Sequence, residues 1–164
     1  MVPKLFIFLC RFCCFFGAAL VAFCNAQAAD KHIGYYYPEP STTETYSSPF
    51  TTFPTADKRT RIGFTVGLNA RQMKKNYAPT YHLFAKGSSA QKMIIVATGD
   101  GQYDTLFRVR GLLAAMSAEA RLSPLFRQLP EPENVNFFDL VKMTGFSQLT
   151  VTDGKNFAHR INVY

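Results

Sequence analysis

The first 28 residues constrain this chain more than any other segment does. Two cations, Lys4 and Arg11, precede thirteen uncharged and mostly apolar residues, and the small-residue triplet Ala26-Gln27-Ala28 follows them. This order predicts a secretory signal peptide over residues 1–28, with cleavage before Ala29. The alternative is a membrane anchor, but the uninterrupted apolar run is shorter than the ~20 residues that span a bilayer. The sequence therefore predicts a periplasmic protein, with anchoring in the inner membrane by this segment as the second possibility.

Cleavage would also remove every thiol of the protein. The four cysteines all lie in the predicted signal segment, at Cys10, Cys13, Cys14 and Cys24. The mature chain of 136 residues would then have neither a disulfide nor a cysteine metal site. Its fold must be held by an apolar core, which a chain of this length can supply.

The mature chain is basic, with 16 Lys and Arg against 11 Asp and Glu, a net charge of +5. Its cations gather in two groups, Lys58, Arg59 and Arg61 before the first predicted strand and Arg71, Lys74 and Lys75 on one face of a short predicted helix, and a solvated charged face is the ordinary interpretation of both. A basic face attracts an anionic phospholipid, a cell-wall polymer or an acidic protein. Export argues against nucleic acid as a partner, and it leaves membrane contact to the signal segment if that segment is not cleaved.

Residues 29–60 differ in composition from the rest of the chain. The stretch 35–60 holds four Pro, three Ser, seven Thr and four Tyr, and its apolar residues follow neither a strand period nor a helix period. We interpret residues 29–60 as an extended arm. Its aromatic side chains could pack on the domain, belong to a tether or dock a partner. The irregular proline spacing favours packing or tethering over docking.

The folded domain is predicted over residues 61–164 and begins with a strand. Large apolar residues alternate with small ones in the order Ile62, Gly63, Phe64, Thr65, Val66, Gly67, Leu68. This alternation is typical of a half-buried strand. The second face of that strand carries only small side chains, so another backbone could approach it closely. Asn69 is then expected to cap a short helix that runs to Asn76.

Further elements follow at regular intervals. Residues 81–86 and 92–98 read as a strand pair, and residues 104–121 as the longest helix, with one apolar face and an ion pair between Asp104 and Arg108. Asn136 is expected to cap another helix, with Asp139 three residues on and Gly145 at its end.

The chain ends in a predicted hairpin around Asp153-Gly154. A three-residue loop through Lys155 sets Val151 opposite Phe157 and aligns the apolar faces, whereas a two-residue loop does not. We therefore predict the three-residue loop, with Gly154 in the left-handed conformation. The element order is β-α-β-β-α-α-β-β. It predicts an α+β fold, an antiparallel sheet of about five strands with two to three helices packed on one face.

The chemical signals are weak. The turn Gly99-Asp100-Gly101 lies between a predicted strand and the long helix, where backbone amides can bind a phosphate, but Asp100 would repel the anion. A glycine turn with a capping aspartate fits better. No two of the three histidines have a metal-ligand spacing, and His159 is expected to face the core with its ring nitrogens hydrogen-bonded. The sequence predicts no catalytic residue, no metal site and no cofactor.

Several segments resemble a known family. The segments are Arg61-Ile62-Gly63-Phe64, Gly67-Leu68, Leu83-Phe84-Ala85-Lys86-Gly87, Ile94-Ile95-Val96-Ala97, Phe137-Phe138-Asp139-Leu140-Val141-Lys142-Met143, Gly145-Phe146, Thr152-Asp153-Gly154 and Phe157-Ala158-His159. They look like a family of small exported alphaproteobacterial proteins, mostly uncharacterised, over residues 61–164. Some members carry the label molybdopterin-guanine dinucleotide biosynthesis protein A. The resemblance implies an exported protein of that lineage, and the label implies an enzyme that acts on a nucleotide.

These observations predict a protein that works by binding or assembly rather than by catalysis. The candidate binding residues are Arg71, Lys74, Lys75 and Asp100, and the expected partner is an envelope protein or an anionic envelope component. The alternative is an enzyme that acts on a nucleotide or another anionic substrate at the turn 99–101.

Overall fold

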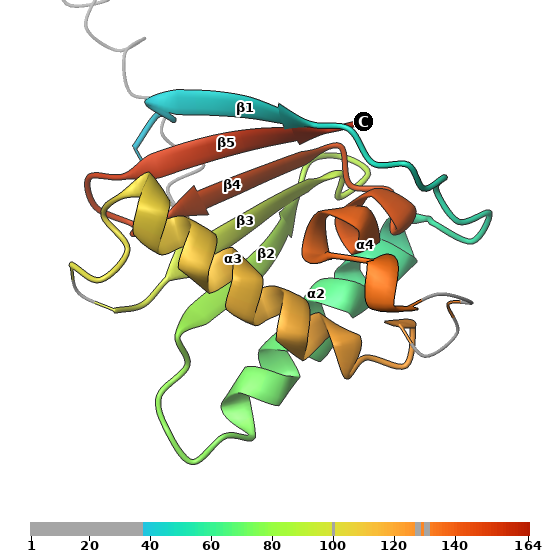
Figure 1. The fold of residues 1–164 in the computed structure, drawn as a ribbon, viewed down its shortest axis with the longest axis horizontal. Helices are drawn as coiled ribbons and strands as arrows, with labels where there is room; N and C mark the ends of the chain where they lie inside the picture. The colour runs from blue at the N-terminus through green and yellow to red at the C-terminus, as the bar shows by residue number, and fades with distance from the viewer. Residues whose placement is uncertain (1–37, 100, 127–128, 130–131) are drawn as a thin grey trace, which may run out of the picture. The chain divides into compact units, whose positions relative to one another are not determined.

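A five-stranded sheet with helices on one face forms the described part of the chain (Figure 1). The computed structural model describes residues 38–164 except 100, 127–128 and 130–131. The strands are β1 (Thr42–Tyr46), β2 (Tyr81–Lys86), β3 (Lys92–Ala97), β4 (Gln148–Thr152) and β5 (Ala158–Val163). The helices are α2 (Lys58–Met73), α3 (Leu106–Arg121), the short 3-10 helix η2 (Pro132–Asn134) and α4 (Phe137–Met143). None of the helices in these residues is long and apolar enough to cross a membrane.

The sheet is mixed, so the prediction of an antiparallel sheet is wrong, whereas the α+β class is confirmed. The strand order is β1-β5-β4-β3-β2, with β2–β3 and β4–β5 antiparallel and β1–β5 and β3–β4 parallel. The parallel pair β3–β4 follows from the connection between the two strands. Helices α3 and α4 carry the chain back to the end at which β3 began, whereas a hairpin would reverse the strand direction.

Residues 62–68 lie in helix α2 and not in a strand, which corrects the sequence prediction. The helix begins at Lys58 because the Asp57 side chain accepts a hydrogen bond from the Thr60 amide at 2.7 Å, as an N-cap does. The buried residues recur at helical spacing and are partly polar: Arg61, Phe64, Thr65, Leu68 and Gln72. Ile62, Gly63, Val66 and Gly67 are exposed, so large and small residues of the predicted strand share the outer surface of a helix.

Asn69 lies within this helix and covers one edge of the sheet, where the sequence predicted a cap. Its Nδ2 donates to the Leu83 carbonyl at 2.8 Å, and its Oδ1 accepts from the Leu83 amide at 2.8 Å. Leu83 belongs to β2, the last strand of the sheet. The side chain of Asn69 therefore takes the place of a neighbouring strand and closes that edge.

Part of the predicted arm belongs to the folded unit. Residues 42–46 form β1, in which Thr42 lies opposite His159 of β5. Tyr46, Phe50 and Phe53 pack against the core and are partly buried. The folded unit thus begins before residue 61. The predicted signal peptide and residues 29–37 lie outside the described residues.

The central elements lie where the sequence predicts them. Strands β2 and β3 match the predicted pair, and Asp104 contacts Arg108 at 2.8 Å as expected. Asn136 caps α4 through a capping box with Asp139, and Gly145 follows the helix at φ +86°. The start of α3 differs. Its N-cap is Thr105, whose hydroxyl accepts from the Arg108 amide, and not the aspartate of the turn 99–101.

The terminal hairpin has a longer loop than the predicted one. Val151 lies opposite His159, so residues 153–157 form the loop and the register differs by two residues from the prediction. A shift of two residues keeps the same side chains on the core face. Asp153 stabilises the loop, because its Oδ1 accepts at 2.8–3.0 Å from three backbone amides, those of Lys155, Asn156 and Phe157. Gly154 has φ +74°, which confirms its predicted left-handed conformation.

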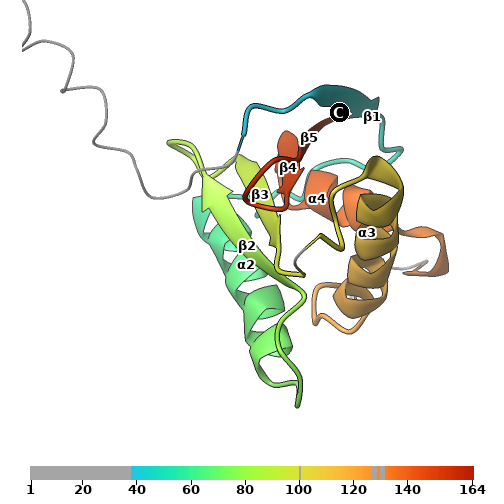
Figure 2. The same cartoon turned by 90° about the vertical axis from the view of Figure 1, so that its left-hand side faces the viewer.

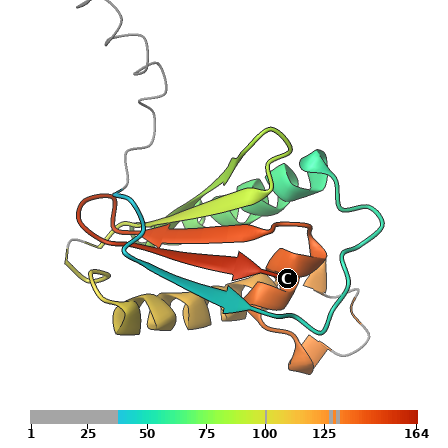
Figure 3. The same ribbon diagram turned by 90° about the horizontal axis from the view of Figure 1, so that it is seen from above.

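The core lies between the sheet and the helices. Alternate strand residues point to that side and are fully buried, as Met93 and Ile95 of β3 and Leu149 and Val151 of β4 show. Figure 3 shows the sheet with the helices behind it, and Figure 2 shows α2 and α3 beneath the sheet. Helix α2 packs mainly along β2, while α3 lies beside α4. This arrangement brings the end of α2 and the flank of α3 to opposite sides of a cavity.

Candidate functional site

A cavity of about 730 Å³ opens between the C-terminal end of α2 and α3. It is lined by Gln72 from α2, Lys75 and Tyr77 from the following loop, Tyr81 from β2, and Arg108 and Glu119 from α3. The volume lies in the range typical of small-molecule sites. The lining combines aromatic rings with polar and charged groups, which suits a small polar ligand.

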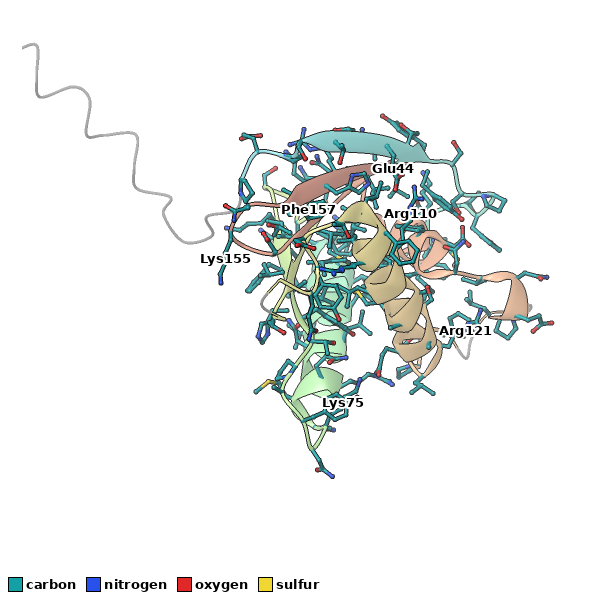
Figure 4. The ribbon with its side chains drawn as sticks, turned by 60° about the vertical axis from the view of Figure 1, so that its left-hand side comes forward. Glu44, Lys75, Arg110, Arg121, Lys155 and Phe157 are labelled. Carbon is teal, nitrogen blue, oxygen red and sulfur yellow. The ribbon has the colours of Figure 1, made fainter. Side chains whose placement is uncertain are left out.

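Lys75 forms an ion pair with Glu119 at this cavity. Both side chains are half-buried, and the Lys75 ammonium also lies 5.5 Å from the centre of the Tyr77 ring. The hydrogen bond to Glu119 raises the pKa of Lys75 by more than burial lowers it. Lys75 therefore remains a cation at neutral pH. Figure 4 shows Lys75 near the end of α2 and Arg121 near the end of α3.

Two buried polar atoms in the cavity wall have no hydrogen-bond partner among the described residues. They are Oε1 of Gln72, whose residue is 1% exposed, and the hydroxyl of Tyr81, whose residue is 2% exposed. Burial raises the pKa of the Tyr81 hydroxyl, and a polar contact with the Gln72 side chain, outside ordinary hydrogen-bond geometry, lowers it by less. Tyr81 is therefore a neutral phenol that can donate or accept. Both atoms are covered in this structure, so a molecule in the cavity would reach them only after the side chains that cover them move.

The glycine turn singled out in the sequence reaches the same cavity. Gly101 lines it with φ +65°, and the Gly101 carbonyl accepts a hydrogen bond from Arg108 Nη1 at 2.7 Å. The structure thus brings the turn together with Lys75, a candidate binding residue from a different part of the chain. The other candidate of this turn, Asp100, lies outside the described residues.

The remaining candidate cations do not share one face with Lys75, which corrects the sequence prediction. Arg71, in the last turn of α2, lines a smaller groove beside residues 123–125. Lys74 is the exposed C-cap of α2, and Lys75 turns away to Glu119. Arg61, counted from the sequence among the surface cations, is buried.

A separate polar cluster joins β1 to the sheet. His159 is buried, with Nδ1 at 2.7 Å from Thr42 Oγ1 and Nε2 at 3.1 Å from Glu44 Oε1. Arg110 of α3 lies 3.5 Å from the other oxygen of Glu44, and Figure 4 shows these two side chains close together. The prediction that His159 faces the core is confirmed. The cluster holds the edge strand β1 against β5 and α3.

Gln72, Tyr81 and Glu119 are among the cavity residues that the sequence did not indicate. Gln72 stands four residues after Leu68 on the buried stripe of α2. This helical spacing can be recognised in the sequence only when Asp57 is taken as the N-cap of the helix. Tyr81 and Glu119 carry no local signal, because distant parts of the chain bring them together. The described residues contain no group of three side chains that could hold a metal ion.

The fold and the cavity define a small α+β protein with a ligand-sized cavity between two helices, whose largely apolar lining also holds charged groups. Comparisons with protein-family models, with curated proteins and with solved structures found no match. Function is therefore inferred from the cavity residues, and the family resemblance stays a prediction.

Proposed function

We propose that this protein is exported and binds a small molecule in the cavity between α2 and α3. The observation that carries the proposal is the pair of buried atoms without partners, Gln72 Oε1 and the Tyr81 hydroxyl. A buried polar group without a hydrogen bond costs about 1–3 kcal/mol. Sequences retain such a cost at functional sites, where a ligand supplies the missing hydrogen bonds.

The charges of the cavity indicate the chemical class of the ligand. Lys75 and Arg108 are cations, and Glu119 is the single carboxylate among the described lining residues. Each cation already pairs with a carboxylate, Lys75 with Glu119 and Arg108 with Asp104, so an anionic group of a ligand would take the place of one of these carboxylates. Gln72 Oε1 can only accept, so the ligand must also carry a donor such as a hydroxyl or an amine. A small hydroxylated or amino-bearing anion meets both requirements.

Binding is favoured over catalysis because the ionisable groups of the cavity are engaged. Glu119 pairs with Lys75, and Arg108 pairs with Asp104. Burial raises the pKa of Tyr81, so its hydroxyl is a poor general base at neutral pH. The described lining residues include no histidine. The polar groups of the cavity can orient a ligand, which is the work of a binding protein.

An enzyme that acts on a nucleotide or another anionic substrate is the second candidate function. It is favoured by Gly101 and Arg108, which bring the turn 99–101 to the cavity. In this case the Asp100 carboxylate would act as a base or hold a cation. Asp100→Asn separates the two functions in a complementation assay. If the protein is a binding protein, its function survives Asp100→Asn. If it is an enzyme, Asp100→Asn abolishes its activity and leaves the fold intact.

Tyr81→Phe tests the binding proposal. The variant should lose at least about tenfold in affinity for small hydroxylated anions while its Tm stays equal or rises, because an unpartnered buried hydroxyl is removed. Thermal shift and calorimetry measure both quantities, with hydroxylated phosphates and carboxylates and their uncharged counterparts as probes. Tyr164→Phe, at a tyrosine that is 64% exposed, is the matched control. A wild-type protein that binds no probe, or a variant that loses stability and keeps its affinity, would contradict the proposal.

A further inference from the structure

Helix α2 has an outward face with an apolar centre. Ile62, Val66 and Met73 are 42%, 58% and 69% exposed. Their spacings of four and seven residues place them on one side of the helix. Gly63 and Gly67 flatten the adjacent strip, since no atom lies within 4 Å of the position that a Cβ would take there. Large apolar side chains gathered on one exposed face indicate a contact surface.

The two ends of this face carry cations. Lys58 and Arg59 stand in the first turn of α2 and Lys74 is its C-cap, whereas Arg71, two residues before Met73, points to the groove beside the face. The helix contains no acidic residue, and the adjacent Asp57 carboxylate is engaged as the N-cap. A second copy of the same face is a poor partner, because basic ends would meet basic ends in either orientation. The charge pattern points to an anionic partner.

An apolar groove of about 240 Å³ runs beside this face. Phe64 and Leu68 of α2 line it together with Pro124 and Leu125, and the Arg71 side chain also lines it. Apolar walls next to a cation match a molecule that joins a hydrocarbon chain to an anionic head. A phospholipid with an acidic headgroup has this combination.

We propose that the outward face of α2 binds the surface of a bilayer that contains anionic phospholipid. In this arrangement Ile62, Val66 and Met73 enter the headgroup boundary, and the cations at both helix ends contact lipid phosphates. Amphipathic helices with an apolar strip and Lys or Arg beside it lie in the plane of the membrane surface in this way. Each cation close to an anionic bilayer raises the binding constant by about fivefold. The surface is distinct from the cavity and uses none of its lining residues.

A single tryptophan at position 66 tests this proposal in the full chain. The protein has no tryptophan, so Val66→Trp reports only the surroundings of α2, even though residues 5–24 are themselves apolar. With vesicles of phosphatidylglycerol, Trp emission should shift to shorter wavelength and brominated acyl chains should quench it. With vesicles of phosphatidylcholine, neither change should occur. Raising the salt from about 0.1 M to about 1 M should weaken the effect.

Two further variants make the outcome specific. Replacing Lys58, Arg59 and Lys74 by Gln in the Val66→Trp chain should lower the apparent affinity for phosphatidylglycerol vesicles at least about tenfold. Phe107→Trp, at a side chain of α3 that is 86% exposed, is the matched reporter and should keep a water-like spectrum. Three results would overturn the proposal. They are equal shifts of Trp emission with both lipids, a shift of Trp emission at position 107 alone, and a shift that depends on protein concentration without vesicles. The last of these results would assign the face to a protein partner.

Discussion

Arg61 connects three parts of the fold through one side chain. Its Nε and Nη2 donate to the Ser89 carbonyl at 2.9 and 2.8 Å, and its Nη1 donates to the carbonyls of Ala56 and Gly145 at 3.3 and 3.4 Å. One guanidinium thus joins the start of α2, the β2–β3 loop and the end of α4. Gly145 must stay small for this purpose, because a Cβ there would stand 2.6 Å from Arg61 Nη1.

Arg61→Lys should lower the free energy of unfolding by about 1–3 kcal/mol. An ammonium keeps the charge but loses the planar fork that donates twice to the Ser89 carbonyl. Urea unfolding monitored by circular dichroism measures the change. Arg59→Lys, at an exposed position of the same helix, is the control and should stay within about 0.5 kcal/mol of the wild type. Equal effects of the two substitutions would contradict the structural role of Arg61.

At the scale of elements, the segment 58–73 shows why alternation alone is an ambiguous signal. Phe64 and Leu68 of the alternating run point inward, and Ile62 and Val66 point outward, as a helix requires for residues two apart. The Asp57 cap decides the case, because it starts the helix ahead of the alternating run. Buried Arg61, Thr65 and Gln72 obscured the helical period in the sequence, since a polar residue ordinarily indicates the solvent side.

Asp153, in the loop of the β4–β5 hairpin, should make the free energy of unfolding of the protein depend on pH. Burial raises the pKa of the Asp153 carboxyl, but the backbone amides of Phe157, Lys155 and Asn156 lower it by more, so the folded-state pKa lies below the ordinary 3.8. The contribution of this group is therefore present above about pH 3.8 and is lost as the pH falls through the lower folded-state value. Asp153→Asn should be less stable than the wild type near pH 7 and should lose less stability on acidification.

Urea unfolding between about pH 7 and about pH 2.5 measures this difference. Asp104→Asn is the matched control, because the Asp104 carboxylate meets the exposed Arg108 side chain rather than backbone amides. A variant at position 153 whose stability follows the same pH curve as the wild type would contradict the assignment.

At the scale of the whole molecule, we expect the chain to be processed after export. Lys4, Arg11 and the apolar run to Cys24 predict cleavage before Ala29. Mass spectrometry of the cell envelope fraction should find a mature form that begins at or next to Ala29. A stable full-length species that remains with membranes after a carbonate wash would instead support an anchor.

The local signals of the sequence determined most of the central elements. The capping box of Asn136 and Asp139, the left-handed Gly154 and the strands on either side of residues 87–91 were all predicted and are confirmed. Each of these depends on residues close together in the chain, whose hydrogen bonds and backbone angles need no distant partner.

Tertiary structure decided the sheet topology, the first strand and the cavity. The polar segment 42–46 becomes a strand because β5 offers it an edge and the cluster of Glu44, His159 and Arg110 holds it there. Gln72, Tyr81 and Glu119 become one site because α2, β2 and α3 pack around the same space. Strand pairing and cavity formation depend on contacts between residues far apart in the chain. The hydrophobic period and the local propensity of a segment do not reveal those contacts.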